Sequence, residues 1–500
     1  MANNTKTKDL LLIIFFLLIG FVIRLYPLSY KNIINPDGVS YINQAKAILD
    51  GNWKLAVNCG YKFISLYHIL IPFFFKLTGD WIIAAKSISL LFGTLTIIPF
   101  YLISKQFFRK STLLLTVLAF SINPFLVSHS EDLIKGPIFW FFALLGVYFF
   151  ITVFNEQAKT RFLLLSSISF LIAGWARLEI ITYIIGSIIY ILFSEKEKTK
   201  RLFTFCLPIM ILALMVISEL VIYQKIFSFW SFYMGPRMIH FNRDLLNNIL
   251  TIKMIGKMGS AVILIINRSL RVVYIPFLLL LLPGLWAVKS ELKRNRNFNY
   301  FILLSLLSFA AVIIHYIKTG IITDRYTAFA VLPLYIFICT GIEKISLYLK
   351  SKGIKEKRII LSICLYIVLM VIAFPHLLVH RRKDQVIFED IGKYIAHLEG
   401  NQQVKMVASD PRITFFANLY SEGIECAHTS FTTYDLITKK KYAEMVSTLK
   451  EKKIKYFLWE KKYWGNSNYD FLTVANPEHF EEIMRWDAKR GKLIAFKVLY

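Results

Sequence analysis

The sequence is poor in charged residues, and its cysteines follow no motif spacing. Each of these two features excludes several classes of protein. Only 18% of its 500 residues are charged, whereas 56% are hydrophobic and the mean hydropathy is +0.55. Soluble domains carry about a quarter charged residues, so this composition excludes a cytosolic enzyme and a disordered tail protein. The five cysteines form no C-x-x-C pair, which excludes a zinc or redox motif of that kind. A secreted disulfide scaffold is excluded by the hydrophobic composition.

Long apolar runs dominate the first 380 residues. The first run, residues 10–28, lacks a small-residue cleavage site and is long enough to stay as a membrane span. A bilayer core of roughly 30 Å needs about 20 apolar residues. We predict eleven spans, at residues 9–29, 81–104, 112–128, 137–154, 162–177, 180–193, 203–223, 270–288, 300–317, 326–343 and 359–379. The apolar segment 63–77 is shorter, so we place it as a re-entrant or interfacial helix.

The basic residues predict how these spans are oriented. With the N-terminus in the cytoplasm, the inside loops hold 21 Lys and Arg, whereas the short outside loops hold 4. Such a bias is typical of multi-pass proteins, whose cytoplasmic loops are rich in Lys and Arg. It predicts a protein integral to the plasma (inner) membrane, with long outer loops at 30–80 and 224–269 and an extracytoplasmic C-terminal domain.

Two domains are therefore predicted, a transmembrane domain at 1–379 and an extracytoplasmic α/β domain at 380–500. The second holds 20 Lys and Arg against 16 Asp and Glu, so most of the net charge of +27 lies in the membrane part and predicts no nucleic-acid partner. The fold class is thus an α-helical polytopic membrane protein with a small C-terminal α/β domain. Within that domain we predict strands at 404–408, 455–459 and 493–499, a turn at Asp410-Pro411, and helices at 442–451 and 480–485.

Ionisable residues at the outer ends of the spans are the candidate functional groups, because a charge near hydrocarbon is costly. Four groups stand out, and all lie on the predicted outer side: Asp37; Glu131, Asp132 and Lys135; Arg177 and Glu179; and Arg325 with Tyr326. Each also has a plain structural explanation, namely a turn aspartate, a hydrophilic hairpin, a snorkelling pair and an interface anchor. Adjacent carboxylates beside a lysine can also bind a metal or a phosphate, and the planar fork of an arginine suits phosphate oxygens.

The order of these groups resembles that of the GT-C glycosyltransferases. Within that superfamily the chain is most similar to the lipid A aminoarabinose transferase and protein O-mannosyltransferase group. The resemblance rests on Asp37-Gly-x-x-Tyr41, Ala45 and Gly51-Asn-Trp53; on Phe73-Phe-Phe-Lys-Leu-Thr-Gly-Asp80, Ala84-Ala-Lys, Leu91-Phe-Gly-Thr-Leu95 and Tyr101-Leu-Ile; on Arg325-Tyr326 and Leu332-Pro333; and on Ser409-Asp-Pro-Arg412 and Phe416-Ala. It spans nearly the whole chain and implies a GT-C-like bundle of about 11 to 13 transmembrane helices.

The resemblance implies a transferase that moves a sugar from a polyprenyl-phosphate donor to an acceptor at the outer face of the membrane. It places Asp37 where the family has its general base or acceptor orienter, although most members have Asp-Glu where this chain has Asp37-Gly38. Further candidates are a second acidic pair with a catalytic role, Glu131 and Asp132; donor phosphate ligands, Arg325, Lys135, Lys62 and Arg177; and contacts to acceptor or sugar, Tyr41, Glu179 and Tyr326.

The chemistry is coherent for such a transferase. Cationic side chains stabilise a polyprenyl phosphate as it leaves. A carboxylate that takes the proton of the acceptor hydroxyl makes that hydroxyl a better nucleophile, and a direct displacement inverts the anomeric carbon.

Cofactor and partners are less defined. A divalent metal stays open, because His129 and His240 lie on the outer side with Glu131 and Asp132, but no spacing demands coordination. The expected partners are a polyprenyl-phosphate sugar, membrane lipid, and an acceptor that is a glycan, a lipid or a protein. The alternative of another class is a lipid-linked sugar flippase or transporter; the sequence shows no repeated halves, which transporters commonly have.

Overall fold

A computed structural model describes most of the chain. It covers residues 2–28, 34–60, 63–155, 159–194, 197–223, 252–287, 297–351, 385–424, 434–464, 469–488 and 491–499, with a few single positions between them. The chain forms two compact units. The first comprises residues 1–28, 65–67 and 86–379, and the second comprises residues 29–64, 68–85 and 380–500. The second unit thus combines the predicted first outer loop with the predicted C-terminal domain.

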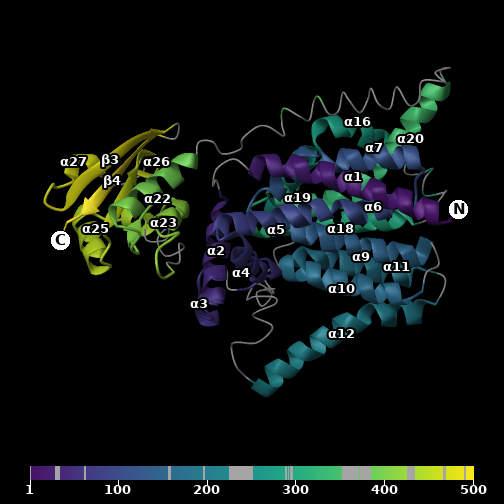
Figure 1. Ribbon diagram of the computed structural model, residues 1–500, viewed down its shortest axis with the longest axis horizontal. Coiled ribbons are helices and arrows are strands. Elements are labelled where there is room, and N and C mark those ends of the chain that lie inside the picture. Colours follow the sequence, from purple (N-terminus) through teal and green to yellow (C-terminus); the bar gives the residue numbers. More distant parts are fainter. Residues whose placement is uncertain are drawn as a thin grey trace. The chain divides into compact units, whose positions relative to one another are not determined.

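The first unit is a bundle of helices that run side by side (Figure 1). Its helices are α1 (Ala2–Leu28), most of α5 (Trp81–Leu95), α6 (Ile97–Lys105), α7 (Lys110–Ser121), α8 (Pro124–Ser130), α9 (Gly136–Asn155), α10 (Arg161–Ala176), α11 (Ile181–Leu192), α12 (Lys198–Tyr223), α15 (Ile252–Val273), α16 (Ile275–Trp286), α18 (Phe298–Thr319), α19 (Asp324–Val331) and α20 (Ile336–Ser351). Two short 3-10 turns, η1 (Leu178–Ile180) and η3 (Leu332–Tyr335), connect α10 to α11 and α19 to α20.

Six segments of the described chain are long and apolar enough to cross a membrane: Thr7–Tyr26, Trp81–Lys105, Gly136–Asn155, Lys198–Val216, Phe298–Thr319 and Asp324–Ile345. Each coincides with a predicted span. Helices α10 and α11 match the predicted spans 162–177 and 180–193, but with 16 and 12 residues they are shorter than these six segments. Most of the predicted span 359–379 lies outside the described residues. The polytopic helical fold predicted from the apolar runs is therefore confirmed.

Two predicted spans differ from the structure because their helices are broken. The predicted span 112–128 is a pair, α7 and α8, bent by 47°. The predicted span 270–288 is wrong at its start, because α15 ends at Val273 and α16 leaves it at 107°. Tyr274 makes this second bend with a φ of 71°, a value that non-glycine residues rarely adopt. Helix α15 itself lies largely inside the predicted outer loop 224–269, so that part of the loop is helical.

Buried polar side chains hold the two bends. Asn123 caps α8 by accepting hydrogen bonds from two backbone amides, and its amide nitrogen donates to the carbonyls of Val272 (3.2 Å) and Val273 (3.0 Å) at the end of α15. Arg24 of α1, only 1% exposed, donates to the carbonyl of Ser121 at the end of α7 (2.9 Å). The carbonyls at a helix end have no partner within the helix, so these side chains satisfy groups that would otherwise be unpaired in an apolar interior.

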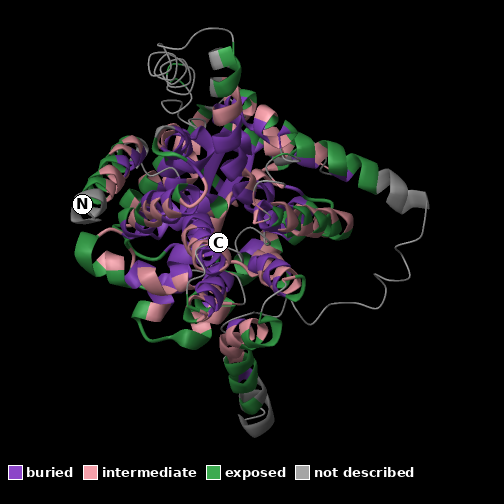
Figure 2. Ribbon diagram, turned by 90° about the vertical axis from the view of Figure 1, so that its right-hand side faces the viewer, coloured by how far each residue is buried: buried purple, intermediate pink, exposed green. Residues whose placement is uncertain are grey.

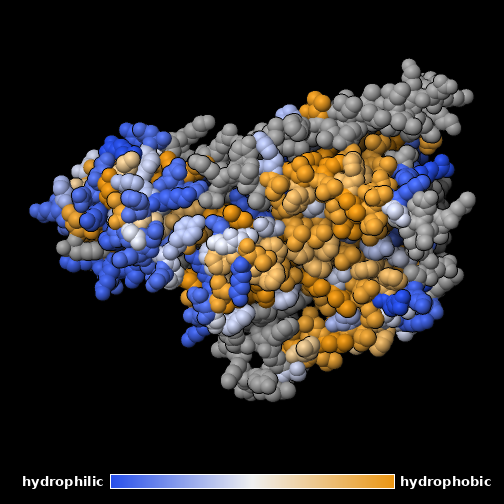
Figure 3. Space-filling model, viewed as in Figure 1, coloured by the Kyte–Doolittle hydropathy of each residue, from blue (hydrophilic) through white to orange (hydrophobic). Residues whose placement is uncertain are grey.

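The surface of the first unit is hydrophobic where its helices face outward. Figure 3 shows a broad hydrophobic surface over these helices, bordered at one end by hydrophilic residues. In Figure 2 the helix that begins at the N-terminus carries many exposed residues, among them Leu11 (61% exposed) and Val22 (62%). An apolar outer surface of this extent is what a lipid bilayer requires of a helix bundle.

The part of the second unit that comes from the first outer loop is also helical. It contains α2 (Pro36–Leu49), α3 (Trp53–Asn58) and most of α4 (Leu66–Thr78). Helix α4, with 13 residues, is the short helix predicted at 63–77. Helix α2 begins at Pro36, because Asn35 caps the helix and Pro36 occupies its first position. Asp37, for which a turn aspartate was one explanation, therefore lies in the first turn of a helix.

The C-terminal part of the second unit is an α/β domain with a four-stranded sheet in the order β1-β2-β4-β3. Its strands are β1 (Met406–Val407), β2 (Tyr456–Glu460), β3 (Phe480–Ala488) and β4 (Gly491–Val498). Strand β1 is parallel to β2, in register Met406 with Tyr456, and the other neighbours are antiparallel. Helices α22 (Val386–Leu398) and α23 (Pro411–Ala417) pack on one face, and α25 (Tyr442–Glu451) packs on the other, with the short helices α26 (Lys461–Trp464) and α27 (Phe471–Val474) beside it.

Most of the domain follows the sequence prediction. The strands expected at 404–408, 455–459 and 493–499 and the helix at 442–451 are confirmed. The predicted turn at Asp410-Pro411 begins helix α23, with Asp410 as its cap. The helix predicted at 480–485 is wrong, because this segment is strand β3. A register shift between Glu482 and Met484 interrupts the two-residue alternation that would have identified a strand.

Candidate functional site

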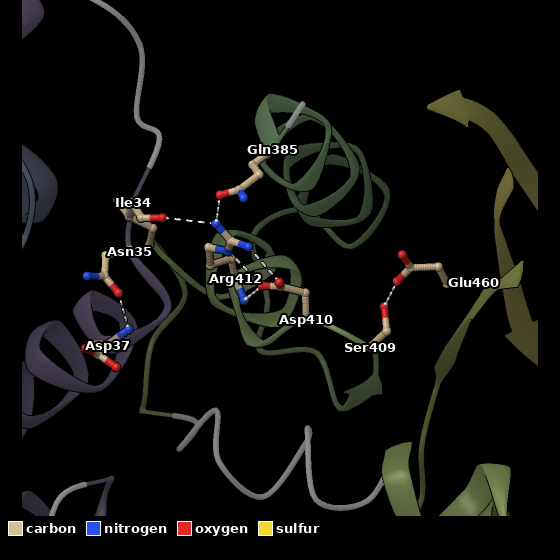
Figure 4. Close-up of polar contacts among 8 residues, drawn as sticks. All are labelled: Ile34, Asn35, Asp37, Gln385, Ser409, Asp410, Arg412 and Glu460. Atoms are coloured by element: carbon tan, nitrogen blue, oxygen red, sulfur yellow. Dashed lines mark hydrogen bonds and ion pairs between the residues drawn. The ribbon is translucent and has the colours of Figure 1, made fainter. Parts of the chain in front are cut away.

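Asp37 lies in the first turn of α2, in the second unit. Its backbone amide donates to the side-chain oxygen of Asn35 at 2.9 Å, so the cap fixes the backbone that carries the carboxylate (Figure 4). The side chain of Asp37 is partly exposed, whereas Gly38 and Val39 behind it are buried. The sequence asparagine-proline-aspartate therefore starts a helix and presents the carboxylate at its first turn.

Tyr41 lies one turn further along α2, and its ring is only 4% exposed. It packs edge to face against the imidazole of His68, with 5.1 Å between the ring centroids. Tyr41 is therefore a core residue of the second unit. Its assignment to the sugar or acceptor stays a prediction. Lys62, the predicted phosphate ligand of the same loop, lies outside the described residues.

Glu131, Asp132 and Lys135 lie in the connection between α8 and α9 of the first unit, and all three are partly exposed. Glu131 ends helix α8. Asp132 lies close enough to Tyr67 for its charge to act on that hydroxyl. Lys135 in turn lies close enough to Glu179 for its charge to act on that carboxylate. The short connection thus brings one cation of the predicted site toward another predicted group.

Arg177, Glu179 and Tyr326 form one cluster in the first unit. Arg177 ends α10 and donates two hydrogen bonds to one oxygen of Glu179, from Nε at 3.1 Å and from Nη2 at 2.5 Å. Its guanidinium lies over the ring of Tyr326, 5.4 Å from the centroid. The same ring also packs against the imidazole of His315, with 4.5 Å between the ring centroids. The ion pair, the cation–π contact and the ring packing fix the direction of a guanidinium that is 15% exposed.

Arg325 lies in the first turn of α19, between two residues that are held by other cations. Asp324 before it accepts a hydrogen bond from Arg268 of α15 at 3.0 Å, and Tyr326 after it lies under Arg177. The first turn of α19 is therefore fixed on both sides of Arg325. The side chain of Arg325 is partly exposed, so it can approach a ligand.

The structure thus groups the predicted residues in two sets. Arg177, Glu179 and Tyr326 are in direct contact, and Lys135 and Arg325 belong to the same unit. Asp37 and Tyr41 belong to the second unit.

Sequence reasoning missed Arg268 and Arg24. Arg268 lay in what was predicted as a loop, and the signal for it was the amphipathic pattern of α15, in which basic residues recur on one side of an apolar helix. Arg24 was hidden inside the first apolar run. An arginine within a span is costly unless it faces the interior of the bundle and is hydrogen-bonded, and this rule alone would have singled it out.

The residues that the structure describes contain no group of three or more His, Cys, Asp or Glu that could hold a metal ion. His129, one of the histidines considered as a ligand, packs against Phe125 and Trp140, and its Nδ1 lies 2.9 Å from the carbonyl of Phe125. His240 lies outside the described residues.

Comparison with known proteins identifies the fold as that of the GT-C glycosyltransferases. Residues 66–223 match the family of dolichyl-phosphate-mannose-protein mannosyltransferases. No curated protein sequence matches the chain. The predicted resemblance is therefore confirmed for the fold.

Three solved structures show how far the similarity extends. ArnT from Cupriavidus metallidurans in the apo state has a TM-score of 0.61 at 12% identity, over 99% of this chain and 98% of ArnT. The same enzyme bound to undecaprenyl phosphate has a TM-score of 0.57 at 11% identity, over 97% of each chain. The oligosaccharyltransferase of Archaeoglobus fulgidus, tethered to an acceptor peptide that contains the sequon NVT, has a TM-score of 0.62 at 11% identity, over 99% of this chain and 74% of its own.

Proposed function

We propose that the chain transfers a sugar from a polyprenyl-phosphate donor to an acceptor hydroxyl at the outer face of the membrane. The observation that carries the proposal is the fixed cationic cluster of the first unit, in which Glu179 and the ring of Tyr326 hold Arg177 beside the first turn of α19. ArnT, which shares the fold, is known in a complex with undecaprenyl phosphate. A lipid phosphate is the kind of ligand that such a cluster at the end of membrane helices suits.

Arg325 is assigned to the donor phosphate, with Arg177, Lys135 and Lys62 as further cations. As the bond between the anomeric carbon and the phosphate oxygen breaks, the electron pair leaves with the polyprenyl phosphate, whose charge increases. Fixed cations stabilise this charge more than a mobile solvent does, because their reorganisation cost has been met in folding. The contacts on both sides of Arg325 support this role, since they fix the backbone from which it extends.

Asp37 is assigned as the base. It takes the proton of the acceptor hydroxyl while the oxygen bonds to the anomeric carbon from the face opposite the phosphate, so the configuration inverts. Glu131 and Asp132 are assigned to orient the acceptor, and Glu179 with Tyr326 to the sugar. The partial exposure of Asp37 at a capped helix start supports the assignment, because a base must reach the substrate.

The outer face is supported by charge and by cysteine chemistry. The 21 basic residues of the predicted inside loops against 4 outside favour a cytoplasmic N-terminus. Cys59, at the end of α3 in the predicted first outer loop, is disulfide-bonded, whereas Cys206 and Cys339 in the bundle are free. Disulfides persist in oxidising compartments, so the second unit is assigned to the extracytoplasmic side.

Two substitutions test the assigned roles in purified protein with a polyprenyl-phosphate sugar. Asp37→Asn is expected to lower kcat by about 10²- to 10⁴-fold, because it removes the base. Arg325→Ala is expected to lower kcat by about 10²- to 10³-fold, because it removes a cation that stabilises the leaving group. Release of free polyprenyl phosphate is the readout.

Lys318→Ala is the matched control, because Lys318 is an exposed cation on the same predicted side to which the proposal assigns no role. It should keep the wild-type rate. Full activity of Asp37→Asn would refute the role of Asp37, and equal losses in Arg325→Ala and Lys318→Ala would refute a specific phosphate ligand.

A further inference from the structure

The backbone that carries Asp37 is tied to the C-terminal domain through one buried arginine. Figure 4 shows Arg412 of α23 reaching the carbonyl of Ile34, three residues before Asp37, with a hydrogen bond of 3.2 Å from Nη1. The same nitrogen also donates to the side-chain oxygen of Gln385, which precedes α22. Ile34 and Asn35 are themselves buried, so the contact lies inside the second unit.

Arg412 is held in place by its own domain. It is only 4% exposed, and its Nε and Nη2 donate to the two carboxylate oxygens of Asp410 at 2.8 and 2.7 Å. Its guanidinium also lies 4.8 Å from the ring centroid of Phe388 in α22. A two-pronged pair of this kind fixes the plane of the guanidinium, and the remaining nitrogen is then aimed at Ile34.

A further hydrogen bond connects the segment just before Arg412 to the sheet. Ser409 follows the end of β1 and donates to the carboxylate of Glu460 at the end of β2 (Figure 4). Both residues are 1% exposed. The backbone just before Asp410 is therefore fixed to two neighbouring strands. The hydrogen bond from Arg412 to Ile34 connects residues 34–37 to this fixed segment.

Two further contacts join the same parts of the second unit. Lys46 of α2 donates to the carbonyl of Leu419 at 2.6 Å, and Tyr420 donates to the carboxylate of Asp80 at 3.1 Å. The segment after α23 thus holds the last turn of α2, while Arg412 holds the backbone just before its beginning. The position of α2 is set by the C-terminal domain at both places.

We propose that Arg412 is a positioning residue, through which the C-terminal domain holds the Asn35-Pro36-Asp37 segment in the geometry that transfer requires. The inference rests on the proposed role of Asp37 and adds a role for the domain. A misplacement of about 1 Å in a reacting group can cost 10²-fold in rate, so one hydrogen bond to the backbone before Asp37 has a measurable consequence.

The test compares Arg412→Lys and Arg412→Gln with the wild type in full-length protein. Lysine keeps the charge beside Asp410 but loses the planar fork, so the contact to Ile34 is lost with the fold least disturbed. We expect kcat to fall about 10- to 100-fold with KM for the donor changed less than about threefold. Hydrogen exchange of the amides at 34–41 should rise at least about twofold without a general rise elsewhere.

The matched control is Glu399→Gln, which weakens the contact of Glu399 with Lys455 and Tyr456 in the same domain but touches nothing in residues 34–37. It should leave both kcat and exchange at 34–41 unchanged. Should Arg412→Gln not fold, Arg412→Lys gives the answer alone.

Unchanged exchange at 34–41 in Arg412→Lys, or faster exchange there with a normal kcat, would overturn the inference. A uniform rise in exchange over the whole second unit would also overturn it, since it would show a role in stability alone. Failure of the proposed function is distinguishable, because the wild type itself would then release no polyprenyl phosphate, whereas hydrogen exchange at 34–41 can still be compared between the wild type and Arg412→Lys.

Discussion

Lys46 shows what burial does to a charged side chain in the second unit. Its ammonium group is nearly enclosed, bonded to the carbonyl of Leu419 and 5.9 Å from the ring centroid of Trp81. Burial lowers the pKa of Lys46 to about 8, and the nearby Asp50 offsets only part of this shift. The folded protein therefore loses this proton at a lower pH than the unfolded chain, in which a lysine titrates near pH 10.4.

The sign of this shift predicts a gain in stability at alkaline pH. Below about pH 8 both states carry the proton, and between pH 8 and 10.5 the unfolded state binds more protons, so this contribution to the free energy of unfolding rises with pH. The full window corresponds to about 3 kcal/mol. The apparent unfolding temperature of the wild type, measured against Lys46→Met across this window, should therefore rise relative to the variant. Parallel curves for the two proteins would contradict the account.

At the scale of single residues, the sequence identified groups but not their partners. Arg177, Glu179 and Tyr326 could be predicted because polar residues at the ends of apolar runs are conspicuous. The cation–π contact between Arg177 and Tyr326 could not be predicted, because it joins residues about 150 positions apart. Arg412 appeared only as part of a resembling motif, since its bond to Ile34 depends on a fold that brings residues 34 and 412 together.

Among the helices, α16 and α20 pack unusually closely, and two glycines permit it. A Cβ atom on Gly284 would lie 1.8 Å from the carbonyl oxygen of Phe337, and one on Gly341 would lie 1.7 Å from that of Leu280. Small residues at such a crossing let two helices approach closely within a membrane, where packing provides much of their association energy.

Gly284→Ala should therefore destabilise the bundle by at least about 2 kcal/mol, because the added methyl group meets backbone that cannot move aside alone. Gly259→Ala in α15 is the control, since nothing lies within 4 Å of the position its Cβ would occupy. Thermal unfolding in detergent should show a clear loss for the first variant and no loss for the second. Equal unfolding temperatures would contradict the close packing of α16 and α20.

The predictions of helix and strand boundaries were correct where the apolar periodicity is continuous, and they were wrong where helices break. The bend after α7 had a local signal, because Asn123-Pro124 is a helix cap followed by a proline at the first helical position. The bend at Tyr274 had none, since it depends on a rare backbone conformation held by tertiary contacts. In β3 the register shift interrupts the alternation of apolar and polar residues, so the sequence pattern did not indicate a strand. The segment is a strand because it pairs with β4.

For the whole molecule, the proposed orientation predicts which side each domain faces. Glu478 in the C-terminal domain and Lys198 at the start of α12 are exposed positions that the topology places on opposite sides. A cysteine introduced by Glu478→Cys should react with a membrane-impermeant maleimide in intact cells, whereas Lys198→Cys should react only after lysis. Labelling of Lys198→Cys in intact cells would reverse the topology and contradict an outer-face enzyme.

The polytopic fold could be predicted because membrane spans and their orientation depend on hydropathy and on basic residues summed over long stretches of the chain. An error at one boundary therefore does not change the predicted fold. The division into two units was not, since the second unit joins residues 29–64 and 68–85 with residues 380–500. The sugar and the acceptor depend on pocket shape, which neither composition nor spacing encodes.

The central claim is tested most directly by supplying the wild-type protein, in a nanodisc, with a panel of polyprenyl-phosphate sugars and an acceptor hydroxyl. The account predicts release of free polyprenyl phosphate together with an equal amount of glycosylated acceptor of inverted configuration. A protein that instead moves the intact lipid-linked sugar between the leaflets of a liposome, with no cleavage of the bond to phosphate, would contradict the account and identify a flippase.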